Sequence, residues 1–116
     1  MTETPRESLA ALRAQALARL SALERDFARI VESAATGQAG GDDEHDPEGA
    51  TLAFERQHVA ALADQAREQV AAIDAALRRL DDGRYGLCER CGRPIGEERL
   101  AARPAAAHCV RCAMIR

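Results

Sequence analysis

Residues 85–112 read YGLCERCGRPIGEERLAARPAAAHCVRC, and they contain all four cysteines of the chain. The cysteines form two Cys-x2-Cys pairs: Cys88 with Cys91, and Cys109 with Cys112. This spacing is typical of a tetrathiolate zinc site, because a two-residue spacer lets one tight turn supply two of the four thiolates that zinc takes in a tetrahedron. The stretch therefore predicts one structural Zn²⁺ held by the four cysteines.

Redox chemistry and disulfide bonding are the alternatives for these cysteines. A thioredoxin-type pair needs a strand–helix context, and the sequence shows no strand pattern around either pair. Disulfides are typical of secreted proteins, but the first residues lack the basic and apolar segments of a signal peptide. No apolar run approaches the roughly 18 residues that a membrane span needs. We therefore expect a cytoplasmic protein with reduced cysteines and no membrane segment.

Four thiolates would also fill the coordination sphere of the metal, whereas a catalytic zinc keeps one position open. His108 adjoins Cys109 and is expected to be a neighbour of the metal rather than a ligand. His58 has no evident catalytic partner. The sequence contains no nucleophile–base pair and no phosphate-binding glycine loop, so we predict that the chain is not an enzyme.

Outside this stretch the 116-residue chain is rich in alanine and lacks tryptophan, a composition that favours long helices packed face to face. Thr4, Pro5 and Glu7 give a strong helix start, because threonine and glutamate form a capping box and proline suits the first turn. Apolar residues then recur every three or four positions: Leu9, Leu12, Ala16, Leu20, Leu23, Phe27 and Ile30.

A second apolar stripe follows a glycine-rich break. Its members are Val59, Leu62, Ala66, Val70, Ile73, Leu77 and Leu80, with Leu52 or Phe54 near its start. Arg78 and Arg79 fall in the last turn of this second helix, where cations suit the helix dipole. Gly83 is suited to end the helix.

These stripes predict a mainly α fold with two domains. Helices at about 4–35 and 51–80, joined by a tip loop at about 36–50, form a long antiparallel, coiled-coil-like hairpin over 1–83. A small C4 zinc finger with a short C-terminal helix follows at 84–116. The stripes could instead pair between two chains, but the short connection favours a hairpin within one chain and hence a monomer.

The loop between the helices reads DDEHDPEG at 42–49 and is strongly acidic. Most charged loops are simply solvated, which is one interpretation of this segment. A tip at the end of helices about 45 Å long could also act as a probe. Its carboxylates could then meet arginines, lysines or a bound Mg²⁺ on a partner.

The residues around the cysteines resemble the zinc-finger signature of the DksA/TraR family. The matching residues besides the cysteines are Tyr85, Gly86, Glu89, Gly92, Ile95, Arg99, Leu100, Ala102, Arg103, Pro104 and Ala106. Residues 73–83 also resemble the segment that precedes the finger in this family. The resemblance implies a protein that binds bacterial RNA polymerase through the finger and the hairpin base. It also implies a coiled coil that enters the secondary channel and alters initiation, without reading DNA sequence.

The resemblance is looser at the tip, where the family pattern is Asp-x-x-Asp-x-Ala: the acidic character is kept, but the exact pattern is not. An ungapped alignment from Cys88 puts His45, Glu48 and Ala50 on this pattern, and a one-residue shift uses Asp46 in place of His45. The implied partner-binding tip consists of Asp42, Asp43, Glu44, His45, Asp46, Glu48 and Ala50.

The family also implies a site for the effector guanosine tetraphosphate. Arg103 matches one of its basic positions and is a possible effector contact, but two other basic positions fall on Ala72 and Ala113. We therefore expect a weak or absent response to the effector.

Two other functions stay open. The chain could be an adaptor hairpin whose finger binds another protein, or a weak DNA-binding finger. The net charge of −3 argues against a nucleic-acid-binding polycation. Arginines outnumber acidic residues in the finger, however, so weak duplex binding stays an alternative.

Overall fold

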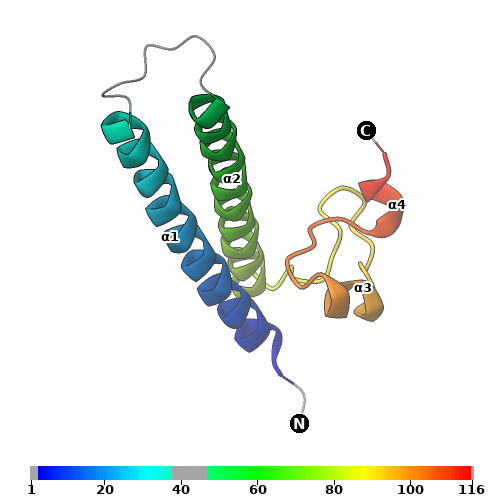
Figure 1. Ribbon diagram of the computed structural model, residues 1–116. Coiled ribbons are helices and arrows are strands. Elements are labelled where there is room, and N and C mark those ends of the chain that lie inside the picture. The colour runs from blue at the N-terminus through cyan, green and yellow to red at the C-terminus, as the bar shows by residue number, and fades with distance from the viewer. Residues whose placement is uncertain (1–2, 38–46, 116) are drawn as a thin grey trace. The chain divides into compact units, whose positions relative to one another are not determined.

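The computed structural model describes residues 3–37 and 47–115 and confirms the mainly helical fold. The helices are α1 (Pro5–Gly37), α2 (Pro47–Asp81), α3 (Glu97–Ala102) and α4 (Val110–Ala113). The two long helices α1 and α2 pack antiparallel, and α3 and α4 belong to the cysteine-containing segment that follows (Figure 1). Among the described residues, none of the helices is both long enough and apolar enough to cross a membrane.

The capping box predicted at the start of α1 is present. The Thr4 hydroxyl accepts the backbone N–H of Glu7 at 3.1 Å, and the Glu7 carboxylate accepts the backbone N–H of Thr4 at 3.2 Å. The Thr4 hydroxyl also donates to this carboxylate at 2.8 Å, and these hydrogen bonds lower the pKa of Glu7. Together they satisfy backbone donors that the first helical turn leaves without intrahelical partners.

The chain divides into two compact units, of which the first comprises Met1–Gln15 and Gln69–Arg116. In this unit the ends of α1 and α2 form the base of the hairpin, and Leu9, Ile73 and Ala76 are buried there. Arg13 on α1 forms an ion pair with Asp74 on α2, with 2.6 Å between Nε and Oδ1. Arg6 on α1 also forms an ion pair with Asp81 on α2. A residue nearer the start of α1 thus pairs with a residue nearer the end of α2, as expected for antiparallel helices.

The second unit is Ala16–Glu68, the remainder of the two long helices. Among its described residues, those that are buried are all alanines: Ala16, Ala63 and Ala66. Small side chains let two helix backbones approach closely, and the larger members of the predicted stripes are half-buried around them. Arg67 pairs with Glu24 at 3.2 Å, and Arg19 donates to Gln65 at 3.3 Å. These contacts across the helix pair are exposed and add little to stability.

The start of α2 differs from the expected start near residue 51. The helix begins at Pro47, and proline suits this place because its fixed φ angle is already helical and its missing N–H has no intrahelical partner there. Of the two candidates for the start of the second stripe, Leu52 is half-buried, whereas Phe54 is 74% exposed. Leu52 therefore continues the apolar face of α2.

The Arg13–Asp74 pair predicts a specific pH dependence of stability. The hydrogen bond from Arg13 lowers the pKa of Asp74 below its ordinary 3.8. The unfolded chain therefore takes up a proton at a higher pH than the folded chain does, and stability falls as the pH drops from about 4 through the lowered pKa. Asp74→Asn should remove this part of the acid sensitivity. The measurement is the thermal unfolding midpoint of the unaltered protein and of Asp74→Asn at several pH values from about 4 downward. A difference between the two midpoints that does not change with pH would contradict the prediction.

Candidate metal centre

The first cysteine pair lies on a tight backbone loop. The N–H of Cys88 donates to the carbonyl of Arg93 at 2.8 Å, and the N–H of Ile95 donates to the carbonyl of Gly86 at 2.8 Å. The N–H of Gly92 closes the turn on the carbonyl of Cys88 at 2.9 Å. Gly92 has a φ angle of 75°, which glycine adopts without strain. The loop thereby presents two thiols from one turn.

The second cysteine pair is positioned by α4. Cys109 is the N-cap of this four-residue helix, and its Sγ accepts the backbone N–H of Cys112 at 3.5 Å. Capping fixes the Cys109 side chain over the first turn, and Cys112 follows within that turn. The second half of the cluster therefore depends on a single helical turn.

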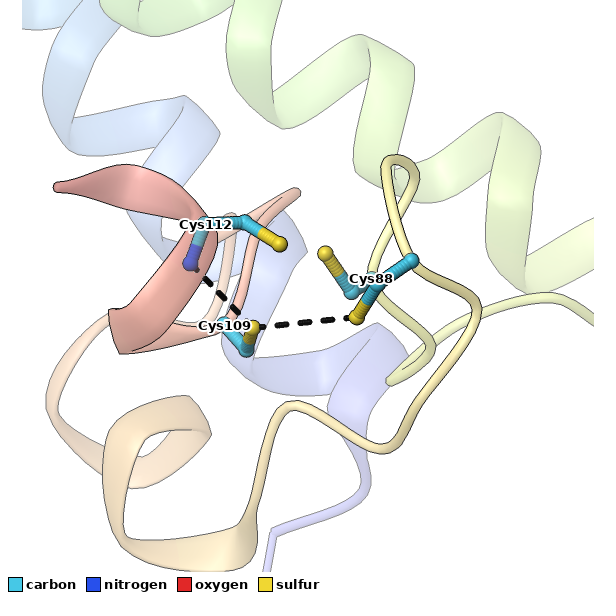
Figure 2. Close-up of side chains that lie close together, drawn as sticks. Cys88, Cys109 and Cys112 are labelled. Carbon is cyan, nitrogen blue, oxygen red and sulfur yellow. Dashed lines mark hydrogen bonds between the residues drawn. The ribbon is translucent and has the colours of Figure 1, made fainter. Parts of the chain in front are cut away.

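The two halves bring all four thiols together, as Figure 2 shows for Cys88, Cys109 and Cys112. The four Sγ atoms lie within 4.8 Å of one another, and none of the cysteines forms a disulfide. Four sulfurs at about 2.3 Å from a tetrahedral zinc would be about 3.8 Å apart, and the sulfurs of Cys91 and Cys109 are 3.9 Å apart. The cluster is therefore suited to one structural Zn²⁺, as predicted.

The thiols differ in their acidity. Burial raises the pKa of Cys112 to about 12, and hydrogen bonds within the cluster add to this effect. Burial also raises the pKa of Cys88, but hydrogen bonds from the backbone of Cys109, Cys91 and Arg90 outweigh it and lower the pKa to about 6. Zinc binds the thiolate, so loading this cluster releases protons and its affinity falls in acid.

The cysteines also make up much of the core of this segment. Cys88 and Cys112 are buried together with Ile95, and Leu100 and Ala106 pack against them. So few apolar side chains bury little area, and small cores of this kind need a metal or a disulfide for stability. Zinc is therefore expected to contribute most of the free energy that folds the segment.

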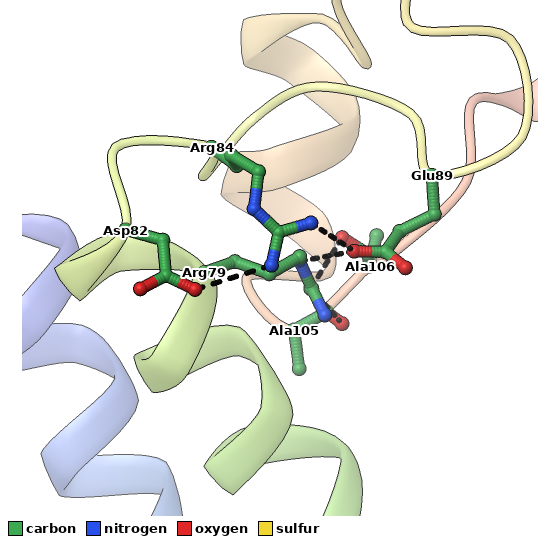
Figure 3. Close-up of polar contacts among 6 residues, drawn as sticks. All are labelled: Arg79, Asp82, Arg84, Glu89, Ala105 and Ala106. Carbon is green, nitrogen blue, oxygen red and sulfur yellow. Dashed lines mark hydrogen bonds and ion pairs between the residues drawn. The ribbon is translucent and has the colours of Figure 1, made fainter.

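The sequence did not reveal that Arg79 is buried. It was expected to be a cation at the end of α2, but its side chain turns inward and contacts Glu89 and the carbonyls of Ala105 and Ala106 (Figure 3). Position 79 lies three residues after the buried Ala76 and so on the same face of the helix. Ala76 is not a member of the predicted apolar stripe, so the sequence pattern did not indicate this burial.

The other predicted site residues fall in two places. Glu48 and Ala50 lie in the first turn of α2, whereas Asp42, Asp43, Glu44, His45 and Asp46 lie outside the described residues. Arg103 is exposed at the end of α3 and lines a pocket of about 490 Å³ with Ala72 and Ala113. The structure thus brings together the three positions that were compared with an effector site.

Comparison with known families decides the class of the cysteine segment. Residues 83–116 match the family described as the prokaryotic dksA/traR C4-type zinc finger. The chain carries a DksA/TraR zinc finger. The predicted resemblance is thereby confirmed, and the four clustered cysteines are suited to the predicted structural Zn²⁺.

Curated relatives are similar in the DksA/TraR finger and in residues next to it. The RNA polymerase-binding transcription factor DksA of Caulobacter vibrioides is 56% identical over 43 residues, which cover 37% of this chain and 30% of that protein. The DksA of Escherichia coli K12 is 41% identical over 49 residues, which cover 42% of this chain and 32% of that protein. The alignments thus span about a third of these relatives. Both are transcription factors by name, which agrees with the prediction that the chain is not an enzyme.

A solved structure extends the similarity beyond the finger. The transcription factor DksA2 from Pseudomonas aeruginosa superimposes with a TM-score of 0.54 and 27% sequence identity. The superposition covers 90% of this chain and 79% of that chain, so it includes the long helices as well as the finger. The order of hairpin and DksA/TraR finger along the chain is therefore shared with this protein.

Proposed function

We propose that this protein binds bacterial RNA polymerase and modulates transcription initiation, with Cys88, Cys91, Cys109 and Cys112 holding one structural zinc. The observation that carries the proposal is the structural similarity to a DksA-type transcription factor over 90% of the chain. A zinc finger alone would fit many functions, but a finger after a long antiparallel hairpin fits this one. The function implies a protein of the bacterial cytoplasm, and we expect it to act as a monomer.

The proposed mechanism assigns separate tasks to the two ends of the hairpin. The finger and the base of the hairpin would bind the outer surface of the polymerase, while the acidic tip enters the secondary channel. Asp46 and Glu48 would be the carboxylates that meet basic side chains or a bound Mg²⁺ there. The proposal is supported by the acidic sequence between α1 and α2 and by the family's known tip pattern.

This division of tasks predicts that binding and regulation can be separated. The double substitution Asp46→Asn and Glu48→Gln removes two charges and keeps the side-chain sizes, so it should leave affinity for polymerase within about threefold while reducing the effect on initiation by about tenfold or more, as expected when charge-assisted contacts are lost. Multi-round transcription in vitro with the cognate polymerase measures regulation, and equilibrium binding to the core enzyme measures affinity.

The matched control for the tip is Glu55→Gln, an exposed acidic position on α2 outside the tip. It should change neither quantity. Equal regulation by the tip variant and the unaltered protein would contradict the mechanism. Failure of every form to bind polymerase would contradict the function and favour the adaptor alternative, while salt-sensitive duplex binding by the finger would favour the DNA-binding one.

The pocket around Arg103 predicts how the protein responds to guanosine tetraphosphate. A polyanion needs several cations, but Ala72 and Ala113 contribute none, and Arg99 already donates to the carbonyl of His108 at 2.8 Å. We expect the effector to change regulation less than about twofold. Transcription assays with and without the effector check this, and Ala72→Lys with Ala113→Lys should increase the response. A strong response by the unaltered protein would contradict the prediction.

A further inference from the structure

The end of α2 contains a buried arginine, which is uncommon for a residue that always carries its charge. Arg79 is 5% exposed, whereas its neighbour Arg78 is exposed on the same turn. A buried guanidinium is costly unless carboxylates or carbonyls surround it. The contacts of Arg79 must therefore explain why its side chain is buried.

Those partners come from both halves of the metal site. The Arg79 Nη2 donates to the carbonyls of Ala106 at 3.3 Å and Ala105 at 3.5 Å, in the segment that leads to Cys109. Its Nε lies 3.8 Å from Oε1 of Glu89, which stands inside the first Cys-x2-Cys loop. Figure 3 shows the side chain between these two segments. One residue of α2 thus contacts the loop of the first cysteine pair and the approach to the second.

The approach to Cys109 depends on such contacts for its position. Residues 104–108, which we term the strap, form neither helix nor strand. Besides the two carbonyls bound by Arg79, the carbonyl of Pro104 accepts the Tyr85 hydroxyl, that of Ala107 accepts the Glu89 N–H, and that of His108 accepts Arg99 Nε, each at 2.8 Å. All five successive carbonyls of the strap therefore accept hydrogen bonds from outside it.

The Arg79 site also has unused hydrogen-bonding capacity. Its Nε is buried and has no hydrogen-bond partner among the described residues. At 3.8 Å the contact with Glu89 is an ion pair rather than a hydrogen bond. Arg84 approaches the same Glu89 oxygen at 3.5 Å and also pairs with Asp82 at 3.2 Å. Glu89 therefore balances the charge of Arg79 only while the first cysteine loop keeps its folded shape.

We propose that Arg79 is a positioning residue for the metal site. Its side chain holds the first cysteine loop and the strap in their relative positions and couples zinc binding to the end of α2. When zinc is bound, the two segments stay in place and Arg79 keeps its partners. When zinc is absent, both segments loosen and the guanidinium loses them. Coupling of this kind is reciprocal, so Arg79 must raise zinc affinity by the same factor by which zinc stabilises the Arg79 contacts.

This inference rests on the zinc site and is independent of polymerase binding, so either proposal can fail alone. The test titrates the full-length chain with Zn²⁺ against a competing chelator at constant pH. Arg79→Met should lower zinc affinity by about tenfold or more, because both segments that carry the cysteines lose a shared contact. Arg78→Met removes the same side chain one position earlier and should leave affinity within about threefold, because that arginine is exposed.

Glu89→Gln gives an independent variant, since it removes the charge but keeps the backbone hydrogen bond to Ala107. It should also weaken zinc binding, and combining it with Arg79→Met should cost less than the sum of the two losses. If Arg79→Met does not fold, this variant decides the question. Zinc affinity equal to that of the unaltered chain in Glu89→Gln, or equal losses in Arg79→Met and Arg78→Met, would overturn the proposal.

Amide hydrogen exchange supplies a second measurement that a merely stabilising role would not change. The N–H of Arg84 donates to the carbonyl of Arg79 at 2.8 Å, and that of Gly83 donates to the carbonyl of Leu80 at 3.2 Å. Zinc should slow exchange of these two amides in the unaltered chain and should slow it much less in Arg79→Met. Equal slowing in both proteins would overturn the coupling.

Discussion

Removal of zinc should unfold the finger while most of α1 and α2 stays helical. Among the described residues of the finger, only Cys88, Ile95 and Cys112 form the buried core, and two of these would be zinc ligands. Zinc binding to structural sites of this kind contributes about 10–16 kcal/mol near neutral pH, which equals or exceeds the stability of about 5–15 kcal/mol that is typical of whole domains. The hairpin base has buried residues of its own, Leu9 and Ile73, which are not metal ligands, so we expect it to stay folded without the metal.

The measurement combines circular dichroism with residue-resolved hydrogen exchange before and after chelation. Helical signal should persist because α1 and α2 contain 33 and 35 residues, while amides at 84–115 should lose protection. Cys109→Ser should reproduce the effect. Met114→Ser changes a side chain that is 79% exposed and should have none. A finger that stays protected after chelation would contradict a structural zinc.

Ile73→Ala should destabilise the base of the hairpin by about 2–5 kcal/mol, the usual range when a fully buried branched side chain is truncated. Ile73 is 1% exposed, and it is one of the two largest fully buried side chains, with Leu9 on the facing helix. Urea unfolding of the zinc-loaded protein, followed by helical signal, gives the free energy.

The control for Ile73 is Phe54→Ala on the same helix. Phe54 is larger but 74% exposed, so its removal should change the free energy of unfolding by less than about 0.5 kcal/mol. A loss at Phe54 equal to that at Ile73 would mean that the apolar faces of α2 are assigned wrongly. A loss below 1 kcal/mol at Ile73 would mean that its burial contributes little.

The features that the sequence predicted correctly depend on short-range spacing. The capping box joins residues three positions apart, and each cysteine pair is set by one turn, so pattern alone determines their geometry. The apolar stripes predicted two long helices because a period of three to four positions marks one helix face. Leu52 and Phe54 both fitted the start of the second stripe, and only packing distinguished them.

Burial of Arg79 could not be predicted because its partners lie far along the chain. Ala105 and Ala106 are 26 and 27 residues away, and nothing local in the sequence indicates that their carbonyls meet this guanidinium. Alanine-rich segments such as 104–108 lack a periodic pattern, so their path depends on tertiary hydrogen bonds. The tip residues Asp42 to Asp46 lie outside the described residues, and their role stays a prediction.

Equilibrium binding to the cognate core RNA polymerase tests the central claim most directly. A fluorescently labelled, zinc-loaded chain would be titrated with polymerase, with and without a protein that occupies the secondary channel. We predict binding at micromolar concentration or tighter, displacement by the channel-binding competitor, and loss of binding in Cys109→Ser. No association at micromolar polymerase, or binding that the competitor leaves unchanged, would contradict the account.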